Sequence, residues 1–174
     1  MYSCLHVSDM AQTAVQVADL LYGTISHAVS WERLNEYGIE ATEEQAQQIT
    51  RQILSLNLYW IRSALGANLS RKDAERVDRA LQARIDTEWE SGFGLGEQDR
   101  RSFWAEAQES ARAYDQVMQE GGSPVSVAMD AAMTLESIRA VNPDDRQKLL
   151  ALLIDVVPVE TFGEMAAEFE MSEG

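Results

Sequence analysis

The sequence predicts an all-α protein in which residues 1–174 form a single bundle of six or seven mostly antiparallel helices. Apolar residues recur every three or four positions along most of the chain, which is the period of a helix face buried against other helices. Capping residues mark several helix starts, and no segment shows the strict alternation of a half-buried strand. With 174 residues, 45% of them hydrophobic, the chain is long enough to form one globular core.

The first helical segment follows an N-terminal arm at residues 1–7. Ser8 and Asp9 are expected to cap a helix with a long apolar stripe. Gly23 interrupts that stripe, so the sequence allows either one kinked helix or two shorter ones before a stop at Gly38.

The second helix is predicted to be the centre of the bundle. Residues 42–45 form a Thr-Glu-Glu-Gln capping box that begins it, and a break at 66–69 ends it. Its apolar residues cover most of its circumference, which is typical of a helix surrounded by others. Ser70 is expected to cap the third helix, which reaches about Trp89.

A glycine-rich loop at 91–96 separates the third helix from the fourth. Ser123–Pro124 and Asn142–Pro143 each combine a capping side chain with proline at the first helical position, so each is predicted to begin a helix. Pro158 ends the second of these helices. A short final helix follows, and residues 171–174 are expected to fray.

The chain carries 29 acidic and 14 basic residues, for a net charge of −15. Residues 1–50 account for −6 of this charge, residues 51–112 for none and residues 113–174 for −9. Nucleic acids and anionic lipids are negative as well, so direct nucleic-acid binding and membrane-surface binding are not expected. The charge instead favours another protein as the partner, one with a basic surface.

Small residue counts exclude several kinds of site. Cys4 is the single cysteine, so no disulfide can form within the chain, and His6 and His27 are too few for a closed histidine-based zinc site. A secretory signal begins with a positively charged region, whereas the first 25 residues here contain no Lys or Arg. No apolar run reaches membrane-spanning length. A cytoplasmic protein is the resulting expectation.

One enzymatic alternative is a magnesium-dependent nucleotide phosphohydrolase of the all-helical carboxylate type. Such enzymes hold Mg²⁺ with a Glu-Glu-x-x-Glu box followed downstream by Glu-x-x-Asp. Here Glu43 and Glu44 are followed by Gln47 in place of the third acid, and Glu75 and Asp78 form the second motif. Acid pairs at this spacing are as frequent as chance predicts for so acidic a chain, so the pattern alone does not assign a metal site.

No other catalytic or cofactor-binding residue is predicted. Ser26 and His27 are adjacent, and adjacent side chains on a helix point apart, so His27 is expected to be a partly buried structural residue. The 91–96 loop lacks the Gly-Lys-Ser/Thr of a phosphate-binding loop. The sequence therefore names no cofactor unless the magnesium alternative holds.

Two groups of residues are candidates for contact with a partner. Phe93 and Leu95 are large apolar side chains on the glycine-rich loop, and they are either buried in the bundle or exposed for contact with a partner. Lys72, Arg76 and Arg79 share a basic face, although acids interleave with them and ion pairs within the helix are the alternative.

These observations predict a non-enzymatic acidic helical protein that acts by protein–protein binding. An adaptor, an inhibitor and a regulator all fit this description, including an inhibitor of a basic nucleic-acid-binding protein. A bundle that holds an apolar ligand beneath the 91–96 loop is a further alternative. The broad apolar coverage of the second helix would also be satisfied in a homodimer.

Overall fold

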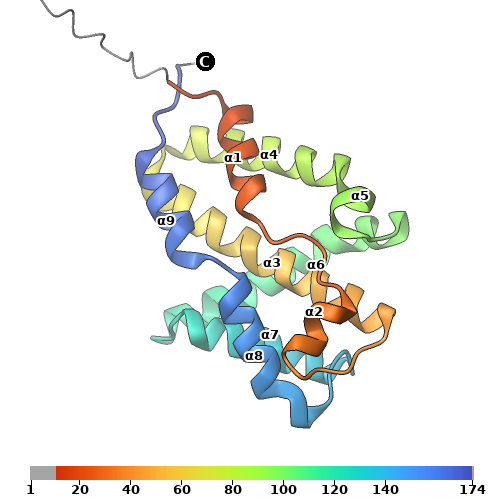
Figure 1. Ribbon diagram of the computed structural model, residues 1–174. Helices are drawn as coiled ribbons and strands as arrows, with labels where there is room; N and C mark the ends of the chain where they lie inside the picture. Colours follow the sequence, from red (N-terminus) through yellow and green to blue (C-terminus); the bar gives the residue numbers. More distant parts are fainter. Residues whose placement is uncertain (1–10, 174) are drawn as a thin grey trace, which may run out of the picture.

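The computed structural model describes residues 11–173, and these residues form an all-α bundle, as the sequence predicts (Figure 1). Seven of its nine α-helices have ten or more residues, in agreement with the six or seven expected. The elements are α1 (Ala14–Thr24), α2 (Trp31–Glu36), α3 (Glu43–Asn68), α4 (Arg71–Thr87), α5 (Trp89–Phe93), α6 (Glu97–Gln119), α7 (Pro124–Ser137), the 3₁₀ turn η1 (Pro143–Asp145), α8 (Arg146–Val156) and α9 (Val159–Glu168).

Helix α3 runs through the centre of the molecule, and the other long helices are arranged around it (Figure 1). It packs against α4, α6, α7 and α9. Every residue from Ile53 to Ile61 is buried, so this stretch is covered on all sides. The wide apolar coverage of the segment is therefore satisfied within one chain, and its central position is confirmed.

The first helical segment is two helices, and its predicted start is wrong. Helix α1 begins at Ala14 because Thr13 caps it: the Thr13 hydroxyl accepts a hydrogen bond from the Gln16 backbone, and the Gln16 side chain accepts one from the Thr13 backbone. Residues 11–13 are not helical, and Ser8, Asp9 and the arm at 1–7 lie outside the described residues.

Most other predicted helix starts are confirmed, and one is not. Thr42 forms a capping box with Gln45, and Ser70 caps α4. Asn142, in contrast, makes no capping hydrogen bond with its side chain. Pro143 begins a single 3₁₀ turn there, and α8 starts only at Arg146. Such a turn is frequent at the N-terminus of an α-helix.

The end of the described chain is paired with its beginning. The backbone N–H of Gln12 donates to the carbonyl of Glu170 at 2.6 Å, and that of Ser172 donates to the carbonyl of Gln12 at 3.0 Å. The two ends of the described chain accordingly lie side by side in Figure 1. Residues 171 and 172 were expected to fray, but Met171 forms an isolated bridge with Gln12 and Ser172 is held by its backbone hydrogen bond.

Polar side chains join α3 to α6. The Tyr59 hydroxyl donates to Asp115 at 3.0 Å, and burial together with that carboxylate raises the pKa of Tyr59 to about 12. The Gln52 amide donates to the Tyr114 hydroxyl, and burial raises the pKa of Tyr114 as well. Both tyrosines are therefore held in the neutral form.

Candidate binding groove

An apolar groove of about 360 Å³ lies where α3, α7, α8 and α9 meet. It is lined by Leu56, Trp60, Pro124, Val125, Ala128, Leu153, Ile154, Val157, Pro158, Val159, Glu160 and Thr161. Leu56 and Trp60 belong to the buried stretch of α3, while Val125 and Ile154 are 51% and 47% exposed. Two large aliphatic side chains in one groove thus remain half open to water.

Proline residues place helix ends at this groove. Pro124 is the first residue of α7, where its missing N–H is no loss, and Ser123 supplies the capping box. Pro158 cannot continue α8, so the chain turns there, and α9 begins at the next residue. The first turns of α7 and α9 and the last turn of α8 therefore meet at the groove.

Acidic side chains begin at the rim of the groove and continue along α9. Glu160 lines the groove, and Glu164 and Glu168 follow at intervals of four residues, which places all three on one stripe of the helix. All three are exposed, and within the described chain no cation forms an ion pair with them. We call these three residues the acidic ridge. The sequence from residue 149 to residue 174 contains six acids and no Lys or Arg.

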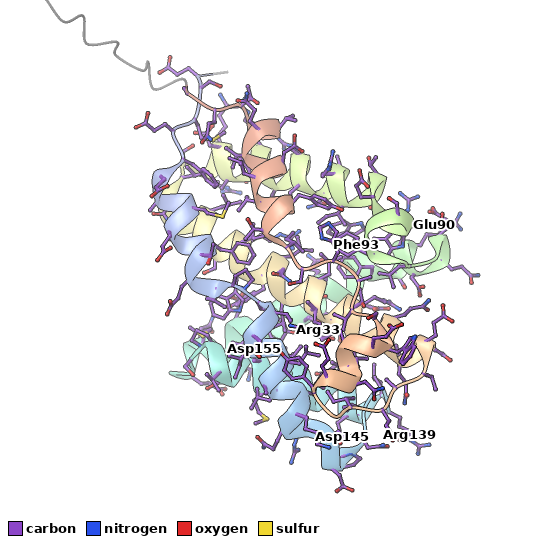
Figure 2. The ribbon with its side chains drawn as sticks, in the orientation of Figure 1. Arg33, Glu90, Phe93, Arg139, Asp145 and Asp155 are labelled. Atoms are coloured by element: carbon purple, nitrogen blue, oxygen red, sulfur yellow. The ribbon has the colours of Figure 1, made fainter. Side chains whose placement is uncertain are left out.

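Phe93 and Leu95 are not available to a partner, which corrects their selection as partner-binding candidates. Each is 1% exposed, so the alternative that they tuck into the bundle holds. Phe93 lies within the molecule and Glu90 at its outer edge (Figure 2). Burial follows from the short helix α5, which turns Phe93 toward the rings of Trp89, His27 and Tyr22.

The glycine-rich loop is a packing site and not a phosphate cradle. A Cβ on Gly92 would lie 2.6 Å from the Tyr22 hydroxyl, so only glycine fits there without a shift. The Gly92 carbonyl accepts a hydrogen bond from the Ala28 backbone at 3.3 Å. His27 is exposed, contrary to the expectation of a partly buried residue, and its ring stacks on Phe93 with centroids 5.7 Å apart.

The basic face of α4 lies away from the groove, which no α4 residue lines. Arg76 forms an ion pair with Asp73 at 3.2 Å, and Arg71 forms one with Glu75 at 2.9 Å. Lys72 and Arg79 are exposed. The alternative of ion pairs within the helix is thus confirmed for Arg76.

The four carboxylates of the magnesium alternative are not brought together. Glu43 and Glu44 are exposed in the first turn of α3, whereas Asp78 pairs with Arg62 near its other end, at 2.8 Å. Eighteen residues of straight helix separate Glu44 from Arg62, which corresponds to about 27 Å. One ion cannot bridge that distance, and residues 11–173 hold no group of three His, Cys, Asp or Glu side chains suited to a metal.

Comparison with known proteins gives the chain no relative. No family model, curated protein or solved structure matches it. Within residues 11–173, no helix has both the length and the apolar character needed to cross a membrane. The groove and its rim therefore have to be interpreted from their own chemistry.

Sequence reasoning missed the groove but contained a signal for its rim. Trp60, Val125 and Ile154 come from three separate helices, and each falls on an apolar stripe that also contains core residues. Nothing in the local pattern distinguishes a half-exposed member of such a stripe from a buried one. The acidic ridge could have been predicted from the sequence, because three glutamates four residues apart share a helix face and no Lys or Arg follows Lys148.

Proposed function

We propose that this chain is a non-enzymatic acidic protein that binds a segment of another protein in the apolar groove. The observation that carries the proposal is the half-exposed pair Val125 and Ile154 on the groove beside the buried Trp60. Large apolar side chains that gather in a depression and remain open to water are typical of interaction sites. As an adaptor, inhibitor or regulator, the protein would act by binding a segment of its partner in this groove.

The lining favours a protein segment over a small metabolite. Small-molecule sites bury most of the ligand's surface and fix the ligand with precisely placed polar groups, whereas Val125 and Ile154 remain half exposed in this groove. The lining here offers only the Glu160 carboxylate, the Thr161 hydroxyl and the Trp60 indole as polar side-chain groups. Apolar side chains of a partner need no such orientation, since burial is not directional.

A basic partner is the second part of the proposal. The net charge of −15 steers cationic surfaces toward the protein, and the acidic ridge begins at the groove itself. A protein that binds nucleic acid is one class of basic partner, and an inhibitor of such a protein would need no enzymatic residues. A single cysteine fits a reducing compartment such as the cytoplasm.

The test is affinity capture with matched surface variants. Ile154→Glu places a charge in the groove at a residue that is 47% exposed, and Leu20→Glu does the same on α1 at one that is 48% exposed. We expect the wild type and Leu20→Glu to retain a common partner that Ile154→Glu loses, with retention falling as salt rises. Identical capture by all three proteins would contradict the proposal.

A further inference from the structure

The acidic ridge on α9 is unfavourable to the free protein. Glu160, Glu164 and Glu168 are neighbours along one face, and like charges four residues apart repel. Glu168 also ends the helix, where the helix dipole disfavours a negative charge. Among residues 11–173 no basic side chain neutralises the stripe, so its charge stays available to a cation from outside.

The ridge and the groove form one continuous surface, because Glu160 belongs to both. Glu164 and Glu168 lie about 6 and 12 Å further along the helix axis, by the rise of an α-helix. A ligand longer than the groove would therefore contact the ridge. Its apolar side chains would face the groove, and positive charges would flank them.

An α-helix suits this surface better than an extended peptide does. Strand addition requires a free sheet edge, and the described residues contain only one isolated bridge, between Gln12 and Met171. Polyproline segments bind grooves lined with aromatic rings, whereas Trp60 is the one aromatic residue here, and it is 9% exposed. A groove among packed helices instead accepts the apolar face of another helix.

A second copy of this chain does not suit the surface. A symmetric dimer places the same patch of each copy against the other. The two acidic ridges would then approach one another, and the chain has no basic segment on α8 beyond Lys148 or on α9 to offset them. The occupant must bring its own positive charge.

We infer that the groove takes a basic amphipathic helix of another protein, with apolar side chains against Val125 and Ile154 and Lys or Arg side chains against the acidic ridge. The inference rests on the proposed function and adds the chemistry of the partner. It predicts that binding needs both parts of the surface, the apolar groove and the ridge.

The test uses labelled designed peptides of about 18 residues, or five helical turns, and fluorescence anisotropy on the full chain. One peptide has Leu on one helical face and Lys on the other, a second has Glu in place of Lys, and a third is a scrambled form of the first. The groove variants are Ile154→Glu and Val125→Asp, and the ridge variant is Glu164→Lys. Val125→Asp lies in the first turn of α7, where an acid is favourable, so it guards against a folding defect in Ile154→Glu.

Matched controls separate the surface from net charge. Glu109→Lys reverses an exposed charge on α6, which contributes no residue to the groove, and Leu20→Glu alters an equally exposed residue on α1. We expect the Leu-Lys peptide to bind about tenfold more tightly than the other two. Each groove variant should weaken it about tenfold, Glu164→Lys should weaken it about fivefold with a shallower salt dependence, and both controls should stay within about twofold.

The outcomes distinguish the inference from the proposed function. If the Leu-Glu peptide binds as well as the Leu-Lys peptide and the groove variants weaken both, the groove binds helices, but the basic-helix inference and the basic-partner part of the proposed function are wrong. If Glu109→Lys weakens binding as much as Glu164→Lys, the charge acts globally and the inference is again wrong. If no groove variant changes the binding of any peptide, both the inference and the proposed function fail.

Discussion

Close contacts with neighbouring atoms, more than a catalytic or ligand-binding role, restrict which residue can stand at a given position in this fold. Gly92 illustrates this, because the Tyr22 hydroxyl occupies the space that a side chain would take. The tyrosine cannot simply move aside, because the residue is only 7% exposed. Its ring meets His27 and Phe93 edge-on and lies under the Arg84 guanidinium. The loop that looks like a ligand cradle in the sequence is thus fixed by packing.

Gly92→Ala is expected to lower the free energy of unfolding by about 1–3 kcal/mol, the usual range for overpacking. Removing the obstructing oxygen with Tyr22→Phe in the same protein should recover part of the loss. Gly66→Ala is the control, since a Cβ there meets nothing within 4 Å and a helical alanine should add about 0.5–1 kcal/mol. Urea denaturation measures all four proteins, and equal stability of Gly92→Ala and the wild type would refute the clash.

Tyr59 predicts a loss of stability at high pH. Its pKa is raised to about 12 in the folded protein from 10.0, so its contribution is complete below pH 10 and is lost as the pH rises toward 12. Denaturation at pH 8 and pH 11 should show the decrease, and Tyr59→Phe should reduce it. Tyr114 shifts in the same direction, so some decrease should remain in that variant.

Among the elements, α9 carries the acidic ridge at a cost to the stability of the free protein. Phe162 and Ala166 anchor it in the core, while the opposite face carries the acidic ridge. A helix this short depends on tertiary packing for its stability, so repulsion on its outer face is tolerated. The proposed binding of a basic partner would offset this repulsion.

Glu164→Lys should stabilise the free protein while it weakens peptide binding. The substitution turns two repulsive pairs, with Glu160 and Glu168, into two attractive ones, for a gain of about 1 kcal/mol. Urea denaturation at low salt measures the gain, and high salt should diminish it. A loss of stability would show that the Glu164 side chain makes an essential contact.

The whole molecule is dominated by its charge of −15. Self-repulsion of this size opposes the compact state, and salt screens it within about 10 Å at 0.1 M. We expect Tm to rise with NaCl from low ionic strength and MgCl₂ to act equally at matched ionic strength. A rise specific to millimolar Mg²⁺ would support the magnesium alternative despite the separation of Glu44 from Asp78.

Much of the fold was readable from the sequence because helix starts are local events. The Thr42 and Ser70 hydroxyls cap their helices by accepting hydrogen bonds from backbone N–H groups three residues further on, and no distant contact is needed to predict them. The start at Ser8–Asp9 was wrong because Thr13 with Gln16 offers an equally local cap. The prediction that Asn142 caps a helix was wrong, because a residue that can cap before proline need not form the capping hydrogen bond with its side chain.

The sequence by itself determined the helical class, the central place of the 43–68 helix and the acidic charge, since each depends on periodicity or counting. Only the tertiary structure decided which apolar side chains stay open to water. Rings from α1 and α5 and the His27 ring cover Phe93, whereas Val125 and Ile154 line the groove between helices. Exposure depends on what distant segments cover, and a local pattern carries no information about that cover.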